Sequence, residues 1–281
     1  MEIALALGLV AILFLIWFLF EKREKVCIVS LVKEPHQFQT WIDHHRNIDK
    51  FYIFQDDDEE DFRVSDDRLI LVKNWKDKFG FKWDDTKDEP INRNRKQRLA
   101  FEIGHRMAIQ DGMKYIIHID SDELLYGQDP SKVFSKYPEA TVFHIKNEEL
   151  APTRHDYKNC FREGSRFHSD RDRFIGYGNG KAAGVVGKCR WYGPHYFKGG
   201  PNVNIPSEEL LVLHYPACNL EETLKRARQY GNFRDDSGTW TEQHKETRDL
   251  LAGCDGDCEE RALYQFRKRI ADDSSKKIHV M

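Results

Sequence analysis

Two aspartates, Asp120 and Asp122, stand two positions apart directly after an apolar stretch at residues 115–119. This stretch is rich in β-branched and aromatic residues, which predicts a buried strand. In open α/β sheets, ligands bind beyond the carboxyl ends of the strands. Carboxylates at this spacing can point the same way and share one hard cation, which would also bridge to a diphosphate. The alternative is an acidic turn that only makes a strand end soluble.

The Asp-x-Asp pattern is not specific by itself, because it recurs at Asp56, Asp170 and Asp255. Of these three, only Asp56 follows a second strand-like stretch, at residues 51–54. If both strands belong to one parallel sheet, their acidic ends converge on the same edge of the sheet. A nucleotide and metal site would need this arrangement.

The elements that must position these acids alternate along the chain. Strand patterns occur at residues 26–32, 51–54, 69–72, 115–119, 141–145 and 210–215, with helical patterns at 37–48, 92–110 and 219–230. Asp129 and Pro130 begin a further short helix, and residues 148–206 are expected to be a loop-rich functional stretch. We therefore predict an α/β fold, with a mixed sheet covered by helices on both faces.

The first residues have a different character. Residues 3–20 are apolar throughout and would span about 27 Å as a helix, which predicts one transmembrane anchor in a lipid bilayer. A secretory signal is the alternative, but no basic region precedes the stretch and no small-x-small cleavage pattern follows it. The expected organisation is an anchor with a short basic flank (1–25), a globular domain (26–235) and a polar helical extension (236–281).

The side of the membrane is indicated only by flanking charges. Lys22, Arg23 and Lys25 follow the apolar segment, whereas only Glu2 precedes it. The positive-inside tendency therefore favours the cytoplasmic face, with the Golgi or ER lumen as the alternative.

Composition excludes other classes of protein. The net charge is -3 and 32% of the residues are charged, so no nucleic acid partner is expected. Six cysteines over this length do not make a disulfide framework. Cys254 and Cys258 would form a small disulfide loop or part of a zinc site, although no second cysteine pair has ligand spacing.

A series of short motifs carries a family resemblance. Residues 29–34, 41–45, 51–54 and 117–123 are followed in order by Gly180-Lys181, Gly193-Pro194-His195 and Leu213-His214-Tyr215. Together they resemble the family 2-like and family 92-like (DUF23-like) glycosyltransferases of the GT-A fold. The likeness covers roughly residues 26–230.

This resemblance implies a single GT-A (Rossmann-like) domain that uses a nucleotide-sugar donor and Mn²⁺ or Mg²⁺. The implied metal ligands are Asp120, Asp122 and His214. The implied nucleoside contacts are Val32, Lys33, Asp56, Asp57 and Asp58. For His214 the alternative is a half-buried histidine at a strand end. The Asn of the family's Lys-Asn-Glu motif is missing after Lys33, and residues 55–58 also depart from the family pattern, so the nucleotide base cannot be read from these positions.

The chemistry expected of such a site follows from charge. Breaking the bond between the sugar and the phosphate puts negative charge on the leaving diphosphate, and a cation held by Asp120 and Asp122 would neutralise it. Lys181 and Arg190 are expected to donate further hydrogen bonds to phosphate, unless they are only solvated loop cations.

An inverting transfer also needs a carboxylate that deprotonates the acceptor hydroxyl. The candidates are Glu148, Glu149, Asp170 and Asp172, and the sequence does not rank them. His195, next to Tyr196, is expected to line the acceptor pocket, or else to pack in an irregular core.

The predicted function is a membrane-anchored, metal-dependent glycosyltransferase. It would transfer a sugar to a hydroxyl of a glycan, glycolipid or glycoprotein, with an inverting outcome favoured. The alternative is a non-catalytic, membrane-tethered module on the same fold that binds nucleotide or glycan. A nucleotidyltransferase is disfavoured because no Gly-rich phosphate loop follows the first strand.

Overall fold

The computed structural model describes residues 23–33, 35, 37–56, 64–85, 89–154, 156–174, 176–216, 275–278 and 280. The expected membrane segment, the expected helix at 219–230 and most of the expected C-terminal extension lie outside these residues. Within the described ranges, no helix is both long enough and apolar enough to cross a membrane.

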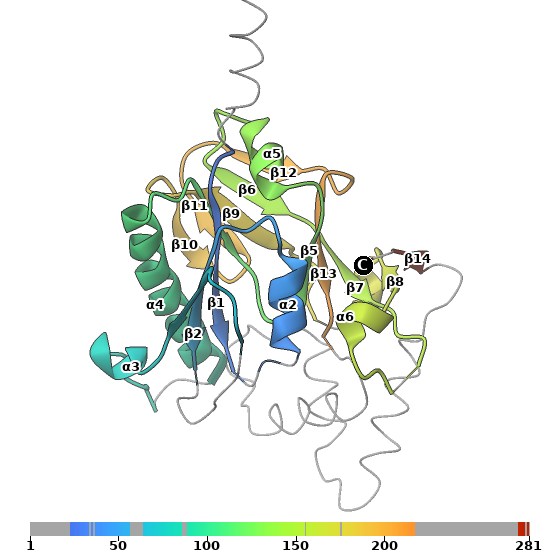
Figure 1. The fold of residues 1–281 in the computed structure, drawn as a ribbon, viewed down its shortest axis with the longest axis horizontal. Coiled ribbons are helices and arrows are strands. Elements are labelled where there is room, and N and C mark those ends of the chain that lie inside the picture. Colours follow the sequence, from blue (N-terminus) through green and yellow to red (C-terminus); the bar gives the residue numbers. More distant parts are fainter. Residues whose placement is uncertain are drawn as a thin grey trace, which may run out of the picture.

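A seven-stranded sheet forms the centre of the molecule, with the strand order β12-β6-β9-β4-β1-β2-β3 (Figure 1). Its strands are β1 (Val26–Val32), β2 (Lys50–Gln55), β3 (Leu69–Val72), β4 (Tyr115–His118), β6 (Val142–Ile145), β9 (Lys181–Val185) and β12 (Asn202–Ile205). The neighbours β1, β2, β3 and β4 are parallel, whereas β9 runs antiparallel to both β4 and β6. The predicted mixed sheet is therefore present.

Helices cover both faces of this sheet, as predicted, because the side chains of its strands alternate between two apolar clusters. On β1, Ile28 belongs to the cluster that contains Trp41 of α2 (Phe38–His44). Its neighbour Val29 belongs to the cluster that contains Phe101 of α4 (Glu89–Gln110). Figure 1 shows α2 and α4 on either side of β1. The burial of both faces explains why the central strands are mainly apolar.

Gly104 sets the close approach of α4 to the sheet. A Cβ atom at this position would lie 2.8 Å from a methyl carbon of Val29. The absence of a side chain therefore lets the helix backbone lie directly on β1.

A second sheet has the order β14-β8-β7-β13-β5. Its strands are β5 (Glu123–Gly127), β7 (Asn147–Leu150), β8 (Arg166–His168), β13 (Leu210–His214) and β14 (Lys276–Lys277). The remaining elements are α3 (Trp75–Lys78), α5 (Pro130–Ser135), α6 (Cys160–Glu163), a 3-10 turn (Arg171–Arg173), β10 (Arg190–Gly193) and β11 (Tyr196–Lys198). The helix expected at Asp129 is confirmed, since the Asp129 carboxylate caps α5 by accepting from the Ser131 N–H at 2.9 Å.

The prediction of a loop-rich stretch at 148–206 is confirmed only in part, because loops there alternate with short strands. The stretch contains β8 to β12 and most of β7, and each of these strands has only three to five residues. Strands of this length are too short to show a clear alternation of apolar and polar residues. Apart from the hairpin of β10 and β11, they also pair with partners that are distant in sequence.

The two sheets meet where the acidic segment passes from β4 to β5. In the second sheet, β13 pairs antiparallel with β5 and parallel with β7. The register places His214 opposite Glu123 on one side and beside Glu149 on the other. Strand pairing thus brings residues from three separate segments to the predicted site.

The described cysteines fall into two kinds. Cys27 and Cys189 are free and buried. Cys160, at the start of α6, is disulfide-bonded, and its partner falls outside the described residues.

Candidate active site

Helix α2 positions the start of β5, and with it the acidic segment. The indole Nε1 of Trp41 donates to the Glu123 carbonyl oxygen at 2.6 Å. His45 Nε2 accepts from the Leu125 N–H at 3.0 Å. Trp41 and His45 are both buried. The motif at residues 41–45 therefore helps to fix the backbone that carries the acids.

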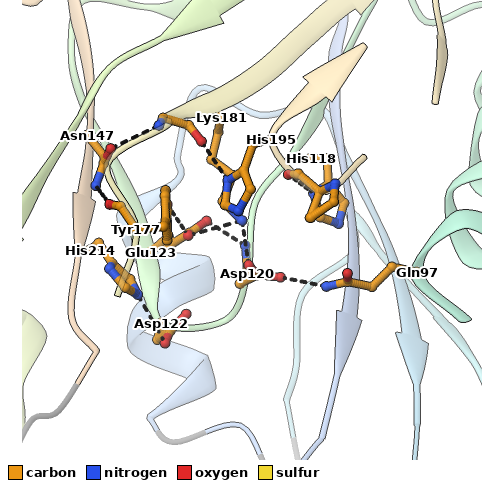
Figure 2. A network of polar contacts seen from close by, with 12 residues as sticks. Gln97, His118, Asp120, Asp122, Glu123, Asn147, Tyr177, Lys181, His195 and His214 are labelled. Carbon is orange, nitrogen blue, oxygen red and sulfur yellow. Dashed lines mark hydrogen bonds and ion pairs between the residues drawn. The ribbon is translucent and has the colours of Figure 1, made fainter. Parts of the chain in front are cut away.

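One half of the site is an internally neutralised ion cluster (Figure 2). Lys181 is fully buried, and its ammonium group contacts an Asp120 carboxylate oxygen and lies 3.1 Å from Glu123 Oε1. Glu123 Oε2 accepts from the Asp120 N–H at 2.7 Å. The Tyr177 hydroxyl also donates to Glu123. We call Asp120, Glu123, Lys181 and Tyr177 the lysine cluster.

Burial and pairing compete in setting the pKa values of this cluster. Burial raises the pKa of Glu123 to about 7, although Lys181 opposes the shift. Burial alone would lower the pKa of Lys181, but the carboxylates of Asp120 and Glu123 outweigh it and raise that pKa. For Asp120, burial is outweighed by Lys181, so its pKa is lowered. Lys181 is thus held as a cation between two carboxyl groups.

The other half of the site surrounds His214, at the end of β13. His214 Nε2 lies 3.6 Å from Asp122 Oδ2, and Nδ1 donates to Glu149 Oε2 at 3.2 Å. Burial alone would lower the pKa of His214, but hydrogen bonds to Asp122 and Glu149 raise it to about 10. We call Asp122, His214 and Glu149 the histidine cluster. Its environment favours a positive charge between two carboxylates.

The donor set of this region fits a divalent cation. Ligand atoms of Asp122, Glu123 and His214 lie within 4.8 Å of one another. Carboxylate oxygens suit Mg²⁺ and Mn²⁺, and imidazole suits transition metals. Glu149 accepts from the ring nitrogen of His214 that faces away from Asp122, which is the usual way of orienting a metal-binding histidine.

The position of Asp120 differs from that of Asp122. Asp120 faces Lys181 and also accepts from Gln97 Nε2 at 3.5 Å. Glu123, to which the sequence assigned no role, lies in the group that could hold a metal. The structure thus places two of the three predicted ligands, Asp122 and His214, together with Glu123, and it places Asp120 in the adjoining lysine cluster.

A glycine-rich loop at residues 176–180 closes around His214. A Cβ atom at Gly176 would lie 2.2 Å from His214 Cε1, and the Gly176 N–H donates to Glu149 Oε2 at 3.0 Å. Gly180 has a positive φ of 68°, and a Cβ there would lie 2.2 Å from the Ile145 carbonyl oxygen. The Gly-x-Gly-x-Gly spacing in the sequence was a signal for this close approach, although it was not interpreted in that way.

The predicted nucleoside contacts lie at the ends of β1 and β2. Val32 is buried and Lys33 is exposed at the end of β1. The Asp56 N–H donates to the Val32 carbonyl at 2.8 Å, so the two strand ends are adjacent as predicted. The Asp56 carboxylate lies 2.5 Å from Lys96 Nζ and 3.8 Å from Lys76 Nζ. Asp57 and Asp58 lie outside the described residues.

Four further predicted residues occupy separate positions. Glu148 is buried on β7, where alternation turns its side chain away from the face that carries Glu149, and burial raises its pKa. Asp172 is exposed in the 3-10 turn, and Arg190 is exposed on β10. His195 is partly buried beside the lysine cluster, with its ring 4.3 Å from the ring of Tyr177.

No known protein-family model matches the chain. Two curated proteins of Arabidopsis thaliana are similar to it. "Glycosyltransferase-like At3g57200" is 28% identical over 169 residues, which is 48% of this chain and 32% of that protein. "Glycosyltransferase-like At2g41451" is 27% identical over 198 residues, which is 58% of this chain and 41% of that protein. The chain therefore spans only about a third of the length of the first relative and about two fifths of the second.

A solved structure with a similar outline is that of S. aureus TarS residues 1–349 in complex with UDP-GlcNAc. It is 9% identical, the match covers 88% of this chain and 82% of that chain, and the TM-score is 0.36. A further crystal structure of S. aureus TarS residues 1–349 gives a TM-score of 0.34. The names of the curated relatives and the mixed α/β topology support a fold of the glycosyltransferase type.

Proposed function

We propose that the chain is a metal-dependent glycosyltransferase that uses a nucleotide-sugar donor. The observation that carries this proposal is the histidine cluster, where Asp122 and His214 face each other beside the carboxyl end of β4. Ligands of α/β sheets bind at such an edge. The names of the two curated relatives support the same class of enzyme.

Asp122 and His214 would hold Mn²⁺ or Mg²⁺, with Glu123 and Asp120 next to them. The bound cation would supply positive charge that stabilises the leaving diphosphate. Glu149 orients the His214 ring, and Lys181 holds Asp120 and Glu123 in place. Each of the residues named in this paragraph therefore has a proposed role that can be tested by substitution.

The donor would lie along the edge formed by the ends of β1, β2 and β4. In this proposal Val32, Lys33 and the segment at Asp56 contact the nucleoside. Arg190 remains a candidate for phosphate binding. The ammonium of Lys181 contacts two carboxyl groups, so a direct phosphate contact would require this pairing to rearrange.

The proposed transfer goes to a hydroxyl of a glycan, glycolipid or glycoprotein, with inversion at the anomeric carbon. Inversion requires a carboxylate that takes the hydroxyl proton. Glu148, Asp170 and Asp172 remain the candidates, and the two aspartates are exposed to solvent. NMR of the product would establish the anomeric configuration, and Asp172→Asn would test the role of that carboxylate.

We further propose that residues 3–20 anchor the chain in a bilayer. The disulfide at Cys160 favours an oxidising compartment, so the lumenal side becomes preferable to the cytoplasmic side. Protease protection in sealed vesicles would decide between the two orientations. Digestion of the globular domain from the cytoplasmic side would contradict the lumenal placement.

The proposed function is tested by nucleotide release from a panel of nucleotide sugars, with Mn²⁺, with Mg²⁺ and with a chelator. We expect release from one donor that stops when the chelator is added and that is lost in Asp122→Asn. Binding of Mn²⁺ and nucleotide without any release, even with a range of acceptors, would favour the non-catalytic module. Release that is unaffected by the chelator would contradict the metal site.

A further inference from the structure

The hairpin of β10 and β11 carries two exposed tyrosines beside the candidate active site. Tyr192 is 62% exposed and Tyr196 is 43% exposed. The register shifts between Trp191 and Gly193, so Tyr192 is an extra residue at a β-bulge. Bulges near active sites commonly re-aim one side chain. Tyr192 is therefore presented to solvent by a specific feature of the backbone.

The opposite side of the hairpin packs on α4 and therefore holds the hairpin in a fixed position. Trp191 and Phe197 pack against Phe101 of α4, with ring centroids 5.3 Å and 4.6 Å away. The exposed side consists of Arg190, Tyr192, Tyr196 and Lys198. We call these four residues the outer face. Because its inner side is packed on a helix, the outer face is a fixed surface.

Each exposed ring of the outer face contacts a neighbouring side chain, and we call the two rings the platform. Lys198 Nζ lies 3.4 Å from the centroid of the Tyr192 ring. The Tyr196 ring stacks on His144 at 5.7 Å with an interplanar angle of 16°. His144 Nε2 donates to the Asn179 carbonyl at 2.6 Å, which fixes its ring. Flat aromatic surfaces with a polar edge suit the apolar face and the hydroxyl groups of a sugar.

The platform is connected to the candidate active site by the hairpin turn. His195 Nδ1 donates to the Gly180 carbonyl at 2.8 Å, and Gly180 directly precedes Lys181. His118 Nδ1 donates to the Pro194 carbonyl at 3.2 Å. Figure 2 shows His195 and His118 beside Lys181 and Asp120. A chain bound on the outer face would thus have one end next to the lysine cluster.

The charge of this region is unlike that of the rest of the chain. The whole chain has a net charge of -3, yet no aspartate or glutamate occurs between Asp172 and Glu208. The basic residues in this interval are Arg173, Lys181, Lys188, Arg190 and Lys198. Arg190 and Lys198 face each other across the hairpin and are exposed. Aromatic rings between exposed cations favour a ligand that combines sugar rings with negative charge.

We propose that the outer face, together with His144, binds the acceptor, and that the acceptor is an anionic glycan, a sugar chain that carries carboxylate or sulfate groups. The identification of this glycan as the acceptor rests on the proposed function. Binding of the glycan does not, because it depends only on the hairpin and His144.

The first test measures binding of three oligosaccharides to the full-length protein by calorimetry. The probes are an oligogalacturonate, a chondroitin sulfate oligosaccharide and a neutral cello-oligosaccharide of equal length. We expect at least one charged probe to bind roughly tenfold more tightly than the neutral one, with an affinity that falls as salt is added. The two charged probes separate carboxylate from sulfate recognition. Equal affinity for charged and neutral probes would overturn the proposal.

The second test places the binding site on the outer face. Tyr192→Ala and Tyr196→Ala should each weaken binding of the charged probe by about tenfold. Lys198→Gln should reduce the preference for the charged probe. The matched controls are Ile109→Ala, which removes an apolar side chain that is 53% exposed on α4, and Lys132→Gln on α5. Wild-type affinity in both tyrosine variants would overturn this location.

A third measurement separates this proposal from the proposed function. Tyr192→Ala and Tyr196→Ala should retain wild-type Mn²⁺ affinity and wild-type release of nucleotide to water, because neither residue belongs to the proposed metal or donor site. Loss of acceptor-stimulated release alone would support the acceptor role. If wild-type protein neither binds Mn²⁺ nor cleaves any donor, the proposed function fails and the anionic glycan site is judged by its binding data.

Discussion

The ends of β2 and β4 look alike in the sequence, since each strand-like stretch stops at an Asp-x-Asp pattern, but their electrostatics differ. At β2, the described carboxylate of Asp56 lies against two lysine ammonium groups, at 2.5 Å and 3.8 Å. At β4, one lysine is shared by Asp120 and Glu123, and Asp122 faces a histidine. The Asp56 carboxylate at the β2 end is thus neutralised by lysines of the protein itself.

The difference teaches that the neighbours of an acidic motif decide how its charge is balanced, and therefore which role we propose for it. At the β4 end, hydrogen bonds to Asp122 and Glu149 raise the pKa of His214, so these carboxylates favour a positive charge there. Lys96 supplies such a charge for Asp56 and leaves little unbalanced negative charge among the described residues. We therefore propose different roles for the same motif, metal coordination at the end of β4 and nucleotide contact at the end of β2.

The largest effect on turnover should come from removing one carboxylate charge at the end of β4 or of β2. Asp122→Asn should reduce metal-dependent turnover by at least about a hundredfold, because it removes a proposed cation ligand. Asp56→Asn should mainly raise KM for the donor, since its role is proposed at the nucleoside. Steady-state nucleotide release measures both effects. A larger loss of kcat in Asp56→Asn than in Asp122→Asn would reverse the roles of the two ends.

Removing the lysine that pairs with the carboxylates at each strand end should lower the free energy of unfolding. Lys181→Met leaves Asp120 and Glu123 buried without a counter-charge, and it should cost about 3–5 kcal/mol in the free energy of unfolding. Lys96→Met should cost about 1 kcal/mol or less, because Lys76 remains near Asp56.

Urea denaturation of the two lysine variants gives both free energies. The comparison fails if Lys96→Met is as destabilising as Lys181→Met.

A steric change can disturb the histidine cluster without altering any charge. Gly176→Ala places a methyl group against the His214 ring, so metal affinity should fall about tenfold to a hundredfold. Gly193→Ala is the matched control, because a Cβ there meets no atom within 4 Å. Mn²⁺ titration of both variants makes the measurement. Equal affinities would show that the ring is free to move away.

The smallest effect concerns pH and compares two buried histidines. In contrast to His214, His45 has a pKa well below its usual value because of burial, and both of its ring nitrogens are used. The unfolded chain therefore binds more protons than the folded chain below about pH 6.5. The contribution of His45 to the free energy of unfolding is present above that pH. It is lost as the pH falls, by up to about 1.4 kcal/mol per pH unit.

Urea unfolding at several pH values tests this sign. His45→Gln should make the free energy of unfolding less dependent on pH between about 5 and 6.5. An unchanged pH dependence would mean that His45 is not held in its neutral form.

Most of the central sheet could be predicted from sequence because β1, β2, β3, β4 and β6 lie in apolar stretches that are bounded by polar residues. These five strands, and β13 of the second sheet, coincide with predicted stretches. Residues 148–206 could not be predicted as strands, since their order depends on pairing partners that a local pattern does not reveal. β5 was hidden for a related reason, because its residues follow the acids directly and read as a continuation of the β4 stretch.

The site was predicted in part. Asp122 was brought forward by its position after the β4 stretch, whereas His214, the last residue of β13, was brought forward by the family resemblance. Glu149 was only one of several possible bases, because its contact with His214 depends on the parallel pairing of β7 and β13. Lys181 was expected at phosphate, since a sequence does not show that a loop lysine is fully buried between two carboxyl groups.

The most direct test of the roles proposed for the two strand ends is a titration of the full-length protein with Mn²⁺. Electron paramagnetic resonance measures the bound ion. We predict one saturable site in the wild type, retained in Asp56→Asn and lost in Asp122→Asn. Retention of that site in Asp122→Asn, or its loss in Asp56→Asn, would contradict the assignment of the cation to the β4 end.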